Sequence, residues 1–263
     1  MSFNPQSVQS LRLDGRVAVV TGSSSGLGKV MALHLGQRGA RLVVNSRSME
    51  RAQNAAADLE KDDIEAIGVA ADVADEKQVE AMMDAAVARF GRLDILVNNA
   101  GIGSLSPAQQ LSIAQWSDII GTNLTGPFIC AQAAAKLMIA QGEGVIINIS
   151  SIYGQTANTQ RAAYVAAKHG LDGLTKALAS EWAPKGLRVC SVNPGYILTP
   201  MLQTTLDTGA FSDVDLKRRT PMGRLAFAEE VAEAVAYLSS PAASFVTGVQ
   251  LPVDGGWLSY GGF

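Results

Sequence analysis

The alternation of short apolar runs with longer helical patterns constrains the fold of this chain more than any other feature. The apolar runs span residues 16–21, 41–45, 66–70, 93–97, 144–149, 187–192 and 250–253. The helical patterns between them span residues 26–38, 49–61, 75–90, 112–140, 161–184 and 229–239. Such alternation is typical of βαβ units, whose strands pair in parallel. We therefore predict an α/β fold, a doubly wound parallel sheet of the Rossmann type, with about seven strands and helices on both faces.

No linker, repeat or low-complexity tract interrupts this alternation, so residues 1–263 are expected to form a single dinucleotide-binding and catalytic domain. The first ten residues are polar and are expected to be loosely ordered. The segment 199–224 contains Pro200, Gly209, Pro221 and Gly223, which predict irregular structure.

Composition excludes several classes of function. Hydrophobic residues make up 48% of the chain and charged residues 17%, which suffices for a large core. The net charge of −3 favours neither a nucleic-acid nor an anionic-membrane partner, and no apolar run reaches the roughly 18 residues of a membrane span. Cys130 and Cys190 lack metal-ligand spacing, so we expect no metal site and a reducing, cytoplasmic location.

A glycine-rich turn joins the first predicted strand to the first helix. It reads Thr21-Gly-Ser-Ser-Ser-Gly-Leu-Gly28. Gly22 can adopt a positive φ in the tight turn, Gly26 lets the backbone approach a pyrophosphate, and Gly28 permits close packing of the helix. The helix N-terminus then offers free N–H groups to phosphates. This position, directly after a strand and opening a helix, favours a dinucleotide site over a flexible loop.

The end of the second predicted strand bears on the choice of cofactor. It reads Asn45-Ser46-Arg47 and carries no carboxylate to accept a ribose 2′-OH. Arg47 can instead form charge-assisted hydrogen bonds to a 2′-phosphate, and Ser25 and Ser46 can add hydroxyl donors. NADP is therefore the predicted cofactor, with NAD as the alternative in which Asn45 and Ser46 receive the 2′-OH.

Tyr164 and Lys168 are four residues apart and so share one face of a helix. A free tyrosine has a pKa of about 10. A neighbouring ammonium favours the phenolate and is expected to lower the pKa of Tyr164. Tyr164 can then exchange a proton with a substrate oxygen near neutral pH. Ser150 and Ser151 close the fifth predicted strand, and a serine hydroxyl there can stabilise charge on that oxygen.

The order and spacing of these motifs resemble the short-chain dehydrogenase/reductase family in its single-domain form, from Val17 to Trp257. The turn has the spacing Gly-x-x-x-Gly-x-Gly rather than Gly-x-Gly-x-x-Gly. The other motifs are Asn98-Asn-Ala-Gly101, Asn123, Ser151, Tyr164-Val-Ala-Ala-Lys168, Asn193-Pro-Gly195 and Asp254-Gly-Gly256. The sequence at residues 193–201 and 219–224 is most similar to that of gluconate 5-dehydrogenase-like sugar and polyol dehydrogenases.

The resemblance implies roles for individual residues. The catalytic set would be Asn123, Ser151, Tyr164 and Lys168, with Asn123 supporting a water that links Lys168 to solvent. Asp72 would accept from the adenine amino group, and the backbone of Ile197 and the Thr199 hydroxyl would hold the nicotinamide carboxamide. The full cofactor-binding set would be Gly22, Ser24, Ser25, Gly26, Leu27, Gly28, Ser46, Arg47, Asp72, Val73, Asn99, Ala100, Gly101, Tyr164, Lys168, Pro194, Gly195, Ile197 and Thr199.

These features predict an NAD(P)-dependent oxidoreductase that transfers a hydride between its cofactor and a secondary alcohol or ketone of a sugar, polyol or sugar acid. The alternatives are a 3-oxoacyl thioester reductase and a non-catalytic cofactor-sensing protein. The expected partner is a small carbonyl or alcohol substrate, and a homotetramer is expected from the small residues of the Tyr164 helix and the aromatic tail after Asp254. The predicted pocket-lining residues carry no charge that demands an anion: Ile152, Tyr153, Gln155, Gln160, Tyr196, Met201 and residues 203–211.

Overall fold

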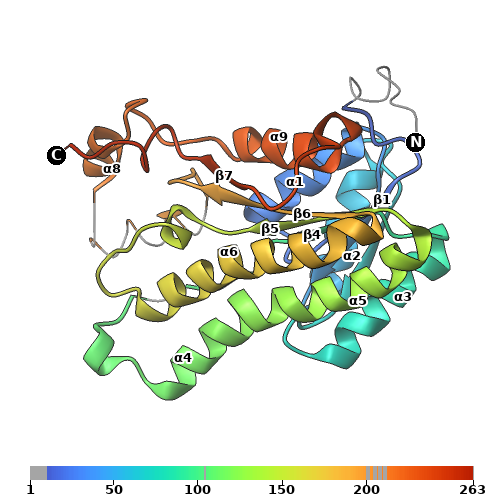
Figure 1. Cartoon of the computed structure of the whole chain (residues 1–263), viewed down its shortest axis with the longest axis horizontal. Coiled ribbons are helices and arrows are strands. Elements are labelled where there is room, and N and C mark those ends of the chain that lie inside the picture. The colour runs from blue at the N-terminus through green and yellow to red at the C-terminus, as the bar shows by residue number, and fades with distance from the viewer. Residues whose placement is uncertain are drawn as a thin grey trace.

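The computed structural model describes residues 11–103, 105–199, 202–203, 206, 209 and 212–262. The expectation of loose order for residues 1–10 lies outside these residues, as do the lining roles of Met201 and of residues 204–205, 207–208 and 210–211. Seven strands form one sheet in the order β3-β2-β1-β4-β5-β6-β7, and all pair in parallel (Figure 1). The order in which successive strands are added reverses between β1 and β4, and doubly wound folds bind ligands at that point.

The elements follow the predicted alternation closely. The strands are β1 (Val17–Val20), β2 (Arg41–Ser46), β3 (Ala66–Ala70), β4 (Ile95–Asn98), β5 (Gly144–Ile149), β6 (Leu187–Pro194) and β7 (Gln250–Val253). The helices are α1 (Gly26–Gln37), α2 (Met49–Glu60), α3 (Glu76–Phe90), α4 (Ile113–Ile120), α5 (Gly126–Gln141), α6 (Ala162–Trp182), α8 (Asp213–Arg219) and α9 (Ala228–Ser239). The predictions for β3, β5 and β7 are confirmed to the residue.

Two cores lie on opposite faces of the sheet. Along β1, Ala18 and Val20 belong to the core under α1, α2 and α9, whereas Val17 and Val19 belong to the core under α3, α5 and α6. This follows from the two-residue period of a strand, which sends successive side chains to opposite faces. Figure 1 shows α1 and α9 on one side of the sheet and α5 and α6 on the other. Because both faces are covered, ligands reach the fold at the carboxyl ends of the strands.

Two predictions about helices need correction. The segment 199–224 was expected to be irregular, but residues Asp213–Arg219 form α8. Ser212 caps this helix by accepting from the N–H of Asp215, and acidic residues in the first turn and basic residues in the last match the helix dipole. The expected helix over 112–140 is divided by a π-helical segment, Gly121–Thr125. Within the described ranges, no helix combines the length and hydrophobicity needed to cross a membrane.

Candidate active site

The glycine-rich turn has the geometry that a dinucleotide phosphate group requires. Gly22 and Gly26 both have positive φ, 61° and 55°. A Cβ at Gly26 would project into open space, so the backbone here is accessible to a ligand. Ser25, the N-cap of α1, makes no side-chain bond to the first turn, which leaves the N–H groups of that turn available to an anion. The turn therefore fits a pyrophosphate.

The loop after β4 supports this turn from beneath. The side-chain amide of Asn99 donates to the carbonyls of Thr21 (2.8 Å) and Gly22 (3.1 Å). A Cβ at Gly22 would lie 2.9 Å from the Cα of Ala100, so the two loops are in direct contact. Asn99 thus satisfies loop backbone groups, as predicted, whereas the Asn98 amide donates to the carbonyl of Pro127 and to the Asn148 side chain. Ala100 and Gly101 thus lie where the cofactor was expected to pass.

Asn45 and Arg47, at the end of β2, lie in different environments, the first buried and the second exposed. Asn45 is 2% exposed. Its side-chain oxygen accepts from the N–H of Gly22 (3.1 Å), and its amide donates to the carbonyl of Ala71 (3.1 Å). Asn45 is thus a structural residue that links three loops at the edge of the sheet. Arg47 is exposed at the strand end, and Ser46 accepts from the N–H of Ser48 (3.3 Å).

The loop after β3 holds the residues predicted to contact adenine. The Asp72 carboxylate accepts from the N–H of Ala74 (2.9 Å), while Gln78 accepts from the N–H of Asp72 (3.0 Å). Val73 is buried against Gly126. These bonds orient Asp72 at the carboxyl edge of the sheet, on the side of β2 and β3.

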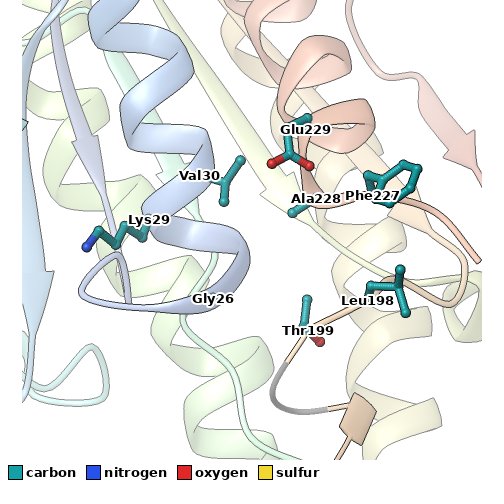
Figure 2. A pocket seen from close by; sticks show the side chains of 8 residues that line it. All are labelled: Gly26, Lys29, Val30, Leu198, Thr199, Phe227, Ala228 and Glu229. Carbon is teal, nitrogen blue, oxygen red and sulfur yellow. The ribbon is translucent and has the colours of Figure 1, made fainter. Parts of the chain in front are cut away.

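A cavity of about 400 Å³ lies between the phosphate turn and the segment after β6. Figure 2 shows Gly26, Lys29 and Val30 of α1 facing Leu198 and Thr199, with the start of α9 closing the third side. The backbone of the 196–198 segment pairs with Ala226. The N–H of Ala226 donates to the carbonyl of Tyr196, and the carbonyl of Ala226 accepts from the N–H of Leu198. In such a parallel bridge the N–H and C=O of Ile197 point the opposite way. Ile197 and Thr199 can therefore serve a ligand that extends from the phosphate turn.

Tyr164 and Ser151 are brought together across α6 and the end of β5. A hydrogen bond with Ser151 and the charge of Arg161 lower the pKa of Tyr164, but burial outweighs both and raises it. The net direction of the Tyr164 pKa is thus upward, opposite to the lowered pKa expected from the sequence, because desolvation of the phenolate outweighs the groups that stabilise it. Ser151 accepts from the N–H of Tyr153 (3.1 Å), whereas Ser150 faces the carbonyl of Lys168 (3.4 Å). Ser151 is therefore the serine that meets Tyr164.

Lys168 lies behind the tyrosine, 5% exposed, with its ammonium nitrogen 5.6 Å from the centroid of the Tyr164 ring. It donates to the carbonyl of Ile149 (2.7 Å). Burial lowers the pKa of Lys168 to about 8, and the charge of Asp172 acts in the opposite direction. Lys168 is consequently charged at neutral pH and close to titration.

Asp172 is a buried carboxylate that was not singled out from the sequence. It lies one turn after Lys168 and accepts from the Ser191 hydroxyl (3.0 Å) and the Asn193 amide (2.7 Å). Asn193 also donates to the carbonyl of Ser151 (3.0 Å). Asp172 therefore connects the Lys168 helix to the strand ends that carry Ser151 and the Pro-Gly turn. Its i, i+8 spacing from Tyr164 was the signal available in the sequence.

Asn123 is fully buried in the π-helical segment between α4 and α5. Its amide donates to the carbonyl of Ile102 (2.7 Å), and its oxygen accepts from the N–H of Ile102 (2.9 Å). Asn123 thus pins the loop that follows Asn98–Gly101. Its role in supporting a water near Lys168 stays a prediction.

Comparisons with known proteins agree with this arrangement. A family model described as Enoyl-(Acyl carrier protein) reductase, of the short-chain alcohol dehydrogenase group, matches residues 22–258. The D-threitol dehydrogenase of Mycolicibacterium smegmatis is 42% identical over 94% of this chain and 94% of its own. The cis-4-hydroxycyclohexanecarboxylate dehydrogenase of Sinomonas cyclohexanicum is 44% identical over 92% of this chain and 96% of its own.

A solved structure adds the fold. The gluconate 5-dehydrogenase from Burkholderia cenocepacia, in complex with NADP and tartrate, superimposes with a TM-score of 0.92. It is 40% identical, and the match covers 96% of this chain and 99% of that chain. With a family model over residues 22–258 and relatives matched over nearly the whole length, the chain belongs to the short-chain dehydrogenase/reductase family and is a nicotinamide-dependent oxidoreductase of secondary alcohols and ketones.

Proposed function

We propose that this enzyme oxidises a secondary alcohol on a cyclic or polyhydroxylated carbon skeleton, a polyol, sugar or sugar acid, and reduces the corresponding ketone. The observation that carries the proposal is Tyr164, whose hydroxyl shares a hydrogen bond with Ser151 and whose ring lies edge to face with the Tyr153 ring, with centroids 6.3 Å apart. Aromatic rings favour the apolar C–H faces of a carbon skeleton, and phenol hydroxyls bond its oxygens. The names of the relatives, a threitol and a hydroxycyclohexanecarboxylate dehydrogenase, support this class.

Four side chains divide the chemistry. The nicotinamide, when bound, accepts or supplies the hydride. Tyr164 takes the proton of the substrate hydroxyl during oxidation and returns it to the ketone oxygen during reduction. Ser151 accepts from the N–H of Tyr153, and when substrate binds, the Ser151 hydroxyl can turn from the Tyr164 oxygen to donate to the substrate oxygen. Lys168 stabilises the phenolate and binds the ribose hydroxyls, and Asn123 supports the water that exchanges protons with solvent.

NADP is the proposed cofactor of choice. Asn45 is buried and engaged with Gly22 and Ala71, so it is not a candidate to receive a ribose 2′-OH. Arg47 is exposed at the end of β2 and can reach a 2′-phosphate. The NADP bound to the Burkholderia cenocepacia gluconate 5-dehydrogenase supports the same choice.

The proposed assembly is a homotetramer in the cytoplasm. Trp257, in the aromatic tail, packs against Tyr196 of its own chain, with ring centroids 5.0 Å apart. Because Trp257 of the tail is already packed within its own chain, the tail gives weaker support for assembly than the sequence suggested. Exposed apolar side chains provide the stronger support: Ile113, Trp116 and Phe128 on α4 and α5, and Phe245 before β7. Large exposed apolar groups of this kind favour burial in an interface.

The test of the reaction is turnover by the purified enzyme. Nicotinamide absorbance would be followed with NADP and NADPH against polyols, sugar acids, cyclic alcohols, their ketones and a 3-oxoacyl thioester. We expect secondary alcohols and their ketones to react. Tyr164→Phe should lower kcat by about 10²–10⁴-fold with cofactor affinity retained. The control is Tyr237→Phe, at an exposed tyrosine of α9. Preference for the thioester, or near-normal kcat in the Tyr164 variant, would contradict the proposal.

A further inference from the structure

Arg161 is a cation of the active site that sequence reasoning passed over. It precedes α6 as its N-cap residue, three positions before Tyr164. Its guanidinium carbon lies 5.7 Å from the centroid of the Tyr153 ring. The Nη1 atom of Arg161 and the Cδ2 atom of Tyr164 each lie 3.9 Å from the point where a Cβ on Gly103 would be. The guanidinium and the proton-transferring ring therefore flank the same glycine.

The surroundings of Arg161 form a mixed aromatic and hydroxyl surface. The Tyr153 ring meets the rings of Tyr164 and Tyr196 edge to face, with centroids 6.3 Å and 6.5 Å apart. The hydroxyls of Tyr153 and Tyr196 share a hydrogen bond of 2.5 Å, and Asn158 donates to the Tyr153 hydroxyl (2.9 Å). Among the described residues, the groups around the Tyr153 ring are therefore neutral hydroxyls, an amide and aromatic rings, with the guanidinium of Arg161 as the charged group against that ring.

The charge of Arg161 acts on two separate hydroxyls of this surface. It lowers the pKa of Tyr164 and opposes the burial that raises the pKa of Tyr196. A half-buried guanidinium among aromatic rings is poorly solvated, and its planar N–H groups match a carboxylate in a two-point contact. Arg161 was not among the residues expected to line the pocket, and folding brings it, at the start of α6, against Tyr153.

We propose that Arg161 binds a carboxylate of the substrate, so that the enzyme acts on hydroxy acids and their keto acids in preference to neutral alcohols. The inference rests on the proposed function, since it needs Tyr164 to act on the substrate hydroxyl. The hydroxyl meets Tyr164 and Ser151, the carbon skeleton lies against the tyrosine rings, and the carboxylate meets Arg161. Another reaction must then consume the keto acid that this enzyme forms, or supply the keto acid that it reduces.

The test compares two substrates that differ only in charge: cis-4-hydroxycyclohexanecarboxylate and its carboxamide. We expect kcat/KM of the natural enzyme to favour the acid by roughly ten- to a hundred-fold, as for a charge-assisted contact. In Arg161→Gln the ratio should fall to near one, and Arg161→Lys should retain part of it. Arg89→Gln is the matched control, because Arg89 pairs with Glu65 before β3, at the opposite edge of the sheet.

Two results would overturn the inference while the proposed function stands: equal kcat/KM for acid and carboxamide in the natural enzyme, or an Arg161→Gln variant that loses activity on both equally. The second outcome would mean that Arg161 supports Tyr164 rather than the substrate. If no secondary alcohol or ketone reacts at all, the proposed function itself fails, and this inference fails with it. Cofactor binding, measured by fluorescence titration, verifies that each variant is folded.

Discussion

Reversal of the charge at Arg47 is the sharpest test of cofactor choice. In the natural enzyme, Arg47 is expected to pair with the 2′-phosphate of NADP. A charge-assisted hydrogen bond contributes about 1.5–3 kcal/mol, and the lower end applies because Arg47 is exposed to solvent. About 1.4 kcal/mol corresponds to tenfold, so the natural enzyme should prefer NADP over NAD by roughly ten-fold in kcat/KM.

Arg47→Asp should reverse this preference. A carboxylate accepts from the ribose 2′-OH of NAD and repels the 2′-phosphate. The buried Asn45 keeps its bonds to Gly22 and Ala71 in the variant, so the phosphate turn should stay intact. Because the contact is remote from the transferred hydride, the change should lie mainly in the cofactor KM.

The assay is steady-state kinetics with each cofactor at a saturating concentration of one reactive alcohol. Lys185→Asp is the control for charge reversal, since Lys185 lies on the surface before β6 at the amino edge of the sheet. It should leave the ratio unchanged. A natural enzyme that uses NAD as well as NADP, or better, would refute the reasoning about Arg47 without affecting Tyr164.

Three further predictions concern the network behind the site, stability and assembly. Asp172→Asn removes the charge that raises the pKa of Lys168, so the alkaline limb of the kcat/KM profile, expected near pH 8, should move to lower pH; an unchanged profile would count against this positioning role. Asp94→Ala should lower the free energy of unfolding in urea by about 3 kcal/mol, the lower end for a buried pair, because the N–H of Val17 loses its acceptor and two partly exposed arginines are left with Glu143 as their carboxylate partner. The pKa of Asp94 is lowered in the folded state, so this contribution is complete above the unfolded pKa and lost as pH falls through the folded one; a variant as stable as the natural protein would contradict it. Light scattering should give four times the chain mass, and Trp116→Glu should give a smaller assembly; a monomeric natural protein would reject the tetramer.

The fold was predictable because the apolar runs, the turn glycines and the helical spacing all indicate the same arrangement of strands and helices. The buried run at 144–149 has no polar residue until Asn148 and so reads as a strand covered on both faces. The Gly22–Gly28 turn was predictable because Gly22 and Gly26 adopt positive φ, which glycine reaches without the steric cost that a Cβ adds. Tyr164 and Lys168 were predictable because the helical period alone places them on one face. α8 was missed since glycine and proline around it outweighed the capping signal of Ser212.

Local periodicity in the sequence therefore determined the elements, their parallel pairing and the Tyr164/Lys168 pair. Tertiary structure alone decided whether Asn45 faces a ligand or the protein, since both of its polar groups bond residues more than 20 positions away. It also decided the direction of the Tyr164 pKa, because desolvation depends on everything packed around the ring. The place of Arg161 beside Tyr153 and Gly103 was settled in the same way. Charge and burial at a site depend on contacts between distant segments, and only the folded chain brings those segments together.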